Sequence, residues 1–197
     1  LHGGTYTVIP DQIETGTLMI ASAATRGDVA IRGTIPTHME ALTAKLLEMG
    51  VSVTSQDDVI SVRIKRGHRP IRLSTQEYPG FPTDLQQPMM AYLTTAQGNS
   101  IITENIFENR FNHVRELRKL GAVISVSKRV ARVRGVSSLH GGDITASDLR
   151  AGAALIVAGL SATGVTRVHN IGYIDRGYEF LEQKLLALDA DIHRAED

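Results

Sequence analysis

Residues 147–168 read SDLRAGAALIVAGLSATGVTRV, and they contain an apolar run that indicates a buried helix. The run from Ala151 to Leu160 has small and apolar side chains almost all round a helix, whereas a surface helix keeps one polar face. It is too short to cross a membrane, which takes about 18 to 20 apolar residues. We therefore expect this helix to lie inside the fold, with strands outside it.

The same order of elements occurs three times along the chain, in residues 14–55, 83–127 and 147–194. Each stretch has a helix pattern, a glycine, a short strand, a second helix pattern that ends in a turn, and a strand. The glycines are spaced by 71 and 66 residues and the turns by 71 and 68. These landmarks are Gly27, Gly98 and Gly164, and Gly50, Gly121 and Asp189. Two independent landmarks with nearly the same offset indicate an internal repeat.

The repeat predicts one α/β domain over residues 1–197, built from three βαβαββ-type units with internal helices and outer sheets. The units span about residues 5–73, 74–140 and 141–197. The third unit ends before a last strand, so we expect it to be incomplete and to be completed by a segment outside this chain. Strands are expected at Val51–Thr54, Val59–Arg63, Ser100–Thr103, Ala122–Val126, Val130–Val133 and Val165–Val168. Hairpin turns are expected at 56–58 and 127–129.

The composition is that of a globular domain and disfavours several functional classes. Hydrophobic residues make up 42% of the 197 residues, and 21 cationic side chains balance 21 anionic ones. A net charge of zero disfavours a nucleic-acid binder, and the absence of long apolar runs disfavours a membrane protein. No cysteine is present, which excludes disulfides and thiolate chemistry within this sequence. We expect a cytosolic protein, and a first residue other than Met suggests a piece of something longer.

Candidate site residues stand near the expected helix starts. Thr83-Asp84 and Ser147-Asp148 have an N-cap pattern, and Glu108–Arg110 and Asp175–Gly177 precede the second helices. Arg150 is expected in a first helical turn, where a cation opposes the helix dipole by about 0.3–1 kcal/mol. A dianionic ligand would explain arginines at these places.

Structural explanations of the same residues stay open. Asp148 and Arg150, or Asp175 and Arg176, could form local ion pairs, and Asp84 could simply cap a helix. The segment YPGFPTD, residues 78–84, is more specific, because two prolines and a glycine give a rigid approach that ends at the acid. A carboxylate held by rigid backbone suits a general base.

Four blocks together resemble a known family. They are FPTD at 81–84, ENRFNHVREL at 108–117, DLRAGAAL at 148–155 and IDRGYE at 174–179. In this order they are similar to the C-terminal half of the UDP-N-acetylglucosamine enolpyruvyl transferases, which act in peptidoglycan synthesis. The resemblance covers almost the whole chain. It implies the enolpyruvyl transferase fold, an inside-out α/β barrel, with the active site in the cleft between two such domains.

The resemblance also implies a reaction and its residues. Enolpyruvate passes from phosphoenolpyruvate to the sugar 3-hydroxyl by addition and elimination, and no cofactor or metal takes part. Asp84 matches the aspartate that contacts the sugar hydroxyl and serves as its base. Ile106 matches a backbone contact to the nucleotide sugar. Arg110, Arg150 and Arg176 match arginines of the phosphoenolpyruvate site.

The sequence departs from the family pattern in one respect that concerns activity. The family's proton donor is usually a cysteine in the N-terminal half, near a lysine and an asparagine, and that half is absent here. We therefore expect this chain alone to be inactive. Two alternatives are the related 3-phosphoshikimate enolpyruvyl transferase and a non-catalytic binding module with the same fold.

Two weaker signals do not indicate functional sites. The seven histidines show no HxH or HxxxH spacing, so we expect no metal site. The cations of Lys65–Arg69, together with Arg72, form a small basic cluster that we interpret as a solvated hairpin loop.

Overall fold

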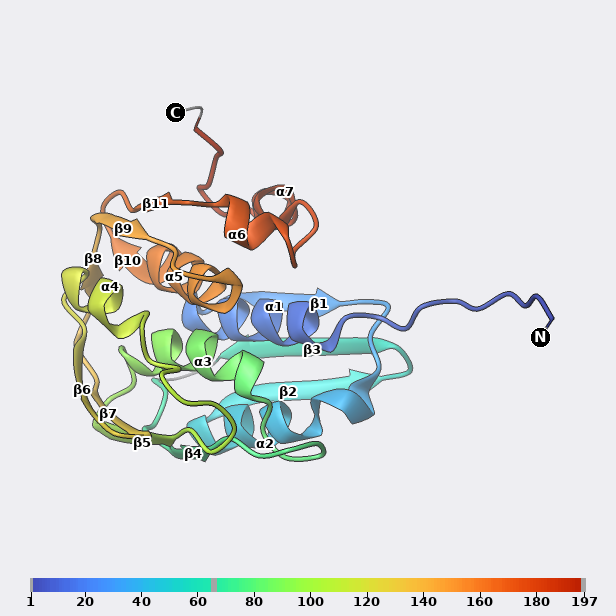
Figure 1. Cartoon of the computed structure of the whole chain (residues 1–197), viewed down its shortest axis with the longest axis horizontal. Helices are drawn as coiled ribbons and strands as arrows, with labels where there is room; N and C mark the ends of the chain where they lie inside the picture. Colours follow the sequence, from blue (N-terminus) through green and yellow to red (C-terminus); the bar gives the residue numbers. More distant parts are fainter. Residues whose placement is uncertain (1, 65–66, 196–197) are drawn as a thin grey trace.

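The computed structural model describes residues 2–64 and 67–195 (Figure 1). Leu1, Lys65, Arg66, Glu196 and Asp197 lie outside the described residues, and with them two cations of the predicted basic cluster and the end of the predicted third unit. The α-helices are α1 Gln12–Ala24, α2 Glu40–Met49, α3 Gln86–Leu93, α4 Val114–Lys119, α5 Leu149–Ser161, α6 Gly172–Asp175 and α7 Leu181–Leu186, with 3₁₀ turns η1 Pro36–Met39 and η2 Thr83–Leu85.

The strands are short and fall into separate sheets. They are β1 Asp28–Ile31, β2 Val51–Gln56, β3 Val59–Ile64, β4 Arg72–Ser74, β5 Asn99–Thr103, β6 Val123–Ser127, β7 Val130–Arg134, β8 Leu139–His140, β9 Asp143–Thr145, β10 Ala162–Thr163 and β11 Arg167–His169. The sheets have the orders β1-β3-β2 and β4-β5-β7-β6, and two further pairs are β8-β10 and β9-β11.

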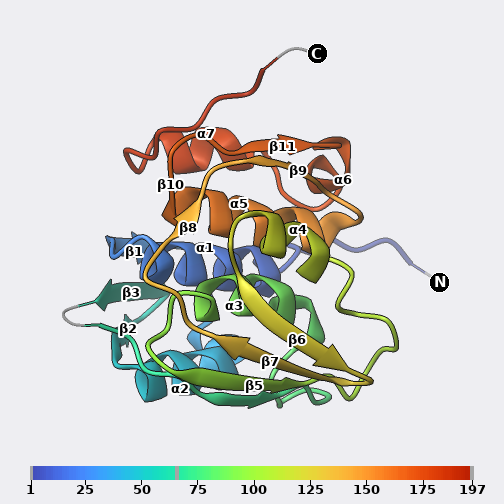
Figure 2. The same ribbon diagram turned by 90° about the vertical axis from the view of Figure 1, so that its left-hand side faces the viewer.

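The first helix of each unit lies in the interior, as the apolar run predicts. Helices α1, α3 and α5 pack on one another, and the strands lie around them (Figures 1 and 2). All eight residues of α3 are buried. In α5, Gly152 is buried, and the residues on either side of it from 151 to 155 are 0% exposed. Gly152 allows close packing here, because a Cβ at this residue would lie 2.5 Å from the Ile174 side chain. Internal helices are therefore confirmed.

Equivalent strands confirm the repeat. In unit one, β3 lies between β1 and β2 and pairs antiparallel with both. In unit two, β7 lies between β5 and β6 and pairs antiparallel with both, so the order β1-β3-β2 matches β5-β7-β6. Strands β4 and β5, which precede and follow α3 in the chain, pair in parallel. In the same way β9 and β11, which precede and follow α5, pair in parallel. No hairpin follows α7 up to Ala195, the last described residue.

The hairpin turns and helix stops also agree with the sequence. Gln56 pairs with Val59 and Ser127 with Val130, so each hairpin has a two-residue loop. The helix stop Gly50 has φ 94° and Gly121 has φ 92°. Asp189 takes the same left-handed region at φ 63°, which short polar side chains tolerate.

Three expectations need correction. The described strands do not close into a barrel, because β2 and β6 are edge strands of separate sheets. The last expected strand begins at Arg167 rather than Val165, whose side chain is 74% exposed. His68 of the basic cluster is not solvated, since it is 5% exposed and its ring lies 4.7 Å from that of Tyr92.

None of the described helices has the combination of length and apolarity that a membrane crossing needs. Residues 2–10 run outward from the body as an exposed extended segment (Figure 1).

Candidate active site

Asp84 sits in a 3₁₀ turn at the entrance to an internal helix. The preceding Pro82 is extended at φ −70° and ψ 135°, and η2 continues directly into α3. No side chain caps either η2 or α3, so the interpretation of Asp84 as a simple N-cap is wrong. The turn leaves the carboxylate 34% exposed, with both oxygens turned to cationic partners.

Two arginines from distant parts of the chain hold this carboxylate. Arg110 Nη2 lies 2.5 Å from Asp84 Oδ1, and Arg150 Nη2 lies 3.0 Å from Asp84 Oδ2. Their side chains are only 23% and 16% exposed. The structure therefore brings together three of the predicted site residues as one cation–anion–cation cluster. Partial burial and fixed geometry favour such charge-assisted hydrogen bonds.

Arg150 is positioned by the helix that carries it and by an aromatic ring. Asp148 caps α5 by accepting from the Arg150 N–H at 3.0 Å and the Ala151 N–H at 2.9 Å. The Arg150 guanidinium lies 5.9 Å from the ring centroid of Tyr178, whose hydroxyl hydrogen-bonds Thr17 Oγ1 at 2.9 Å. Burial raises the pKa of that hydroxyl. Asp148 is thus a cap and not the ion-pair partner of Arg150.

Arg110 comes from the loop between β5 and α4 rather than from a helix start, because α4 begins at Val114. Its carbonyl accepts from Gln87 Nε2 at 3.2 Å, which ties the loop to α3. The guanidinium lies 5.2 Å from the ring centroid of Phe107. Its buried Nε has no partner within the described residues.

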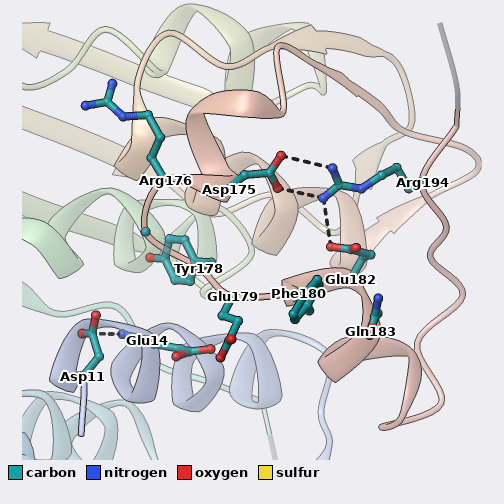
Figure 3. Close-up of a pocket in the computed structure, with 11 residues that line it drawn as sticks. Asp11, Glu14, Asp175, Arg176, Tyr178, Glu179, Phe180, Glu182, Gln183 and Arg194 are labelled. Carbon is teal, nitrogen blue, oxygen red and sulfur yellow. Dashed lines mark hydrogen bonds and ion pairs between the residues drawn. The ribbon is translucent and has the colours of Figure 1, made fainter. Parts of the chain in front are cut away.

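Arg176 stands apart from the cluster. It follows the last residue of α6, is exposed, and forms no ion pair with a described residue. Asp175 instead binds Arg194 at 2.7 and 3.1 Å, so the local pair predicted for Asp175 and Arg176 is wrong. Figure 3 shows the Arg176 side chain turned away from that pair.

A hollow of about 740 Å³ lies beside Arg176. Carboxylates dominate its polar lining, which includes Asp11, Glu14, Asp175, Glu179, Glu182 and Arg194 (Figure 3). Asp84, Arg110 and Arg150 do not line this hollow. Tyr178 connects it to the cluster, because the Arg150 guanidinium lies 5.9 Å from the Tyr178 ring centroid. The Asp84 cluster is partly open to solvent, because the Asp84 side chain is 34% exposed and those of Arg110 and Arg150 are 23% and 16% exposed.

Ile106 has one backbone group already engaged. Its N–H donates to Glu104 Oε1 at 2.9 Å, whereas no donor among residues 2–64 and 67–195 pairs with its carbonyl. A backbone contact from Ile106 to a ligand is therefore available through the carbonyl. Glu104 could not be recognised from the sequence, because a single acidic residue after a strand forms no pattern.

His113 is a second residue that the sequence did not reveal. It is 1% exposed, and neither ring nitrogen has a partner in the described structure. Burial lowers its pKa to about 3, with Asp148 acting to raise the pKa and Arg110 to lower it. The imidazole is therefore neutral at pH 7, and it is buried close enough to Asp148 and Arg110 for both charges to act on it.

We expect His113 to make the fold sensitive to acid. Below a pH of about 6.5 the unfolded imidazole binds a proton that the buried one does not, so stability falls as pH drops toward 3. The loss between pH 7.5 and pH 5 should be about 2 kcal/mol. Urea unfolding of the full-length protein at both pH values measures it. His113→Leu should remove about this part of the pH dependence, and an unchanged slope would contradict the assignment.

Within the described part of the chain, no group of three or more His, Asp or Glu side chains could hold a metal ion.

Comparison with known proteins places this chain in a family. The sequence model of the EPSP synthase (3-phosphoshikimate 1-carboxyvinyltransferase) family matches residues 1–185. A UDP-N-acetylglucosamine 1-carboxyvinyltransferase of Desulfofundulus thermocisternus is 56% identical over 190 residues, which cover 96% of this chain and 78% of that protein. This chain belongs to the UDP-N-acetylglucosamine 1-carboxyvinyltransferase family. UDP-N-acetylglucosamine 1-carboxyvinyltransferase 3 of Caldanaerobacter subterraneus subsp. tengcongensis is 54% identical over 98% of this chain.

The chain spans about half the length of most of the curated relatives that it matches. It covers 46% of the Caldanaerobacter protein, for example. Among solved structures, the enolpyruvyl transferase NikO from Streptomyces tendae superposes with a TM-score of 0.87 at 31% identity. The match covers 95% of this chain and 45% of NikO. Apart from closure of the barrel, the enolpyruvyl transferase fold predicted for this carboxyvinyltransferase family member is therefore confirmed.

Proposed function

We propose that this chain is the C-terminal half of an enzyme that transfers enolpyruvate from phosphoenolpyruvate to the 3-hydroxyl of UDP-N-acetylglucosamine, for peptidoglycan synthesis. The relatives at 50–56% identity carry that enzyme's name. The observation that carries the proposal is the Asp84 carboxylate held between Arg110 and Arg150, with 34% of its side chain exposed.

The cluster supplies a base and anion-binding groups at one place. Protonation of the methylene carbon of phosphoenolpyruvate by the other half makes its C2 electrophilic, and the sugar oxygen then bonds to C2. Asp84 accepts the hydroxyl proton late in this step, when the oxygen is already partly bonded. The C2–O bond to phosphate then breaks, and a proton leaves the methyl carbon to restore the double bond.

The arginines provide the charge complementarity that an enol phosphate needs. Guanidinium groups bind phosphate and carboxylate oxygens in pairs. Arg150 and Arg110 would exchange part of their bonding to Asp84 for the substrate, and the exposed Arg176 would close on it from α6. The second half of the enzyme would cover the Asp84 cluster. A bacterial cytoplasmic location is part of this proposal.

Binding and turnover of the full-length protein test the proposal. Phosphate release should require both phosphoenolpyruvate and UDP-N-acetylglucosamine, and the sugar nucleotide should raise the melting temperature. Protection by shikimate 3-phosphate alone would favour the 3-phosphoshikimate enzyme. Binding without phosphate release under any condition would favour the non-catalytic module. Residues 1–197 alone should release no phosphate.

Arg176→Lys in the full-length protein is expected to raise KM for phosphoenolpyruvate about tenfold, because a lysine cannot make two parallel hydrogen bonds. The melting temperature should not change, since Arg176 is exposed and has no ion-pair partner among the described residues. Steady-state kinetics with each substrate varied measures the effect. An unchanged KM would remove Arg176 from the site.

A further inference from the structure

Glu104 is a buried carboxylate that joins three segments around the candidate site. It follows β5 directly and is 1% exposed. Its Oε1 accepts from the N–H groups of Ile106 at 2.9 Å and Phe107 at 3.1 Å. Thr75 Oγ1 donates to the same oxygen at 2.9 Å, and Thr83 Oγ1 donates to Oε2 at 3.0 Å.

These four bonds form a hub of Glu104, Thr75, Thr83 and the backbone of residues 106–107. The hub connects the segment that carries Asp84 with the segment that leads to Arg110. Thr83 is the residue before Asp84 in η2, and the 106–107 backbone leads into the loop that carries Arg110. One carboxylate therefore fixes the loop that presents the Ile106 carbonyl relative to the turn that presents Asp84. The strand side of the hub is fixed as well, because Thr75 Oγ1 also accepts from the Asn105 N–H at 2.9 Å.

The surroundings of Glu104 suit a geometric role rather than a chemical one. Its exposure of 1% keeps it from contacting a substrate that binds at the Asp84 cluster. All four partners are neutral donors, and no cationic side chain of the described residues pairs with it. A buried acceptor with every bond made holds its neighbours rigidly, and loss of those bonds leaves them unpaired.

We propose that Glu104 is a positioning residue, which sets the spacing between the Ile106 carbonyl and the Asp84 carboxylate for the sugar nucleotide. This inference rests on the proposed function for the identity of the ligand. It predicts that loss of Glu104 weakens use of the sugar nucleotide much more than use of phosphoenolpyruvate. Arg150 and Arg176 have no bond to Glu104, and Arg110 is held separately by the bond from Gln87 Nε2 to its carbonyl.

Three variants of the full-length protein separate this role from others. Glu104→Ala should raise KM for UDP-N-acetylglucosamine about 30-fold, and Thr83→Val, which breaks only the Oε2 bond, about fivefold. Glu104→Gln keeps an oxygen for the three donors at Oε1, and the Thr83 hydroxyl can turn to accept from its amide, so KM should rise only about threefold. KM for phosphoenolpyruvate should stay within about threefold throughout. A loss of folded protein would instead lower kcat and leave both KM values unchanged.

Glu116→Gln is the matched control. Glu116 is also a shielded carboxylate, with a side chain 12% exposed, that accepts from a backbone N–H, that of Thr145 at 2.9 Å. It ties α4 to β9 and has no bond to the hub, so both KM values should stay within about twofold of wild type.

Several results would overturn the inference. A folded Glu104→Ala protein with normal KM for the sugar nucleotide would do so. A Glu104→Gln protein as impaired as Glu104→Ala would show that charge, not geometry, is required. If Glu104→Ala does not fold, Thr83→Val decides, and a normal KM there is equally contrary.

A failure of the proposed function is recognised separately, because the wild-type protein would then release no phosphate. Hydrogen exchange still tests the hub in that case. The Ile106 and Phe107 amides should exchange about tenfold faster in Glu104→Gln, whose neutral oxygen is a weaker acceptor, and at the wild-type rate in Glu116→Gln. Unchanged protection in Glu104→Gln would overturn the positioning role.

Discussion

Asparagine in place of Asp84 should lower kcat of the full-length enzyme about 10³-fold, within the range for removal of a general base. Asparagine keeps the shape and one oxygen for a guanidinium, but it cannot accept the proton of the sugar hydroxyl. KM for phosphoenolpyruvate should not rise, because Arg110 and Arg150 lose an anion that competes with the substrate for them. Phosphate release with each substrate varied in turn measures both quantities.

The control for this prediction is a surface aspartate in a comparable pair. Asp28→Asn removes the exposed ion pair with Arg63 on β1 and β3 and should leave kcat unchanged. The melting temperature should move by no more than a few degrees for either variant. A large loss of stability with normal turnover of Asp84→Asn would make Asp84 a structural residue.

Features that depend on neighbouring residues could be predicted from the sequence. The apolar run of α5 and the left-handed stops at Gly50 and Gly121 are local patterns, and each is present in the structure. The hairpins at 56–59 and 127–130 are local as well. Short parallel pairs such as β8-β10 were not expected, since strands of two residues form only where the tertiary fold brings them together.

The sequence named residues of the candidate site but could not give the contacts between them. The blocks pointed to Asp84, Arg110 and Arg150, yet the Arg150–Asp84 bond joins residues 66 positions apart. N-cap reasoning for Asp84 failed because a 3₁₀ turn precedes α3 and leaves the carboxylate free to face the arginines. Glu104 and His113 could not be recognised from the sequence. Both are buried, and neither the hydrogen bonds of Glu104 nor the unpaired ring nitrogens of His113 leave a pattern in a single sequence.

Arg150→Lys should lower kcat/KM for phosphoenolpyruvate about 10²-fold in the full-length enzyme. The side chain is 16% exposed and bonds Asp84 while its guanidinium faces the Tyr178 ring. A lysine keeps the charge, but its ammonium is a compact point charge. It cannot contact Asp84, the Tyr178 ring and a substrate oxygen at once, as the planar guanidinium can. Arg150→Met should have a larger effect, because Asp84 then keeps only Arg110 as a cationic partner.

Arg63→Lys serves as the control, since Arg63 is 58% exposed and pairs with Asp28 on the surface. It should leave all kinetic constants unchanged. Normal phosphoenolpyruvate kinetics for Arg150→Lys would place Arg150 outside the substrate site. The double variant Asp84→Asn/Arg150→Lys extends the test, because two groups that act as one unit lose less together than the sum of their separate losses. Strict additivity of the two effects on kcat/KM would mean that the ion pair seen here plays no part in the reaction.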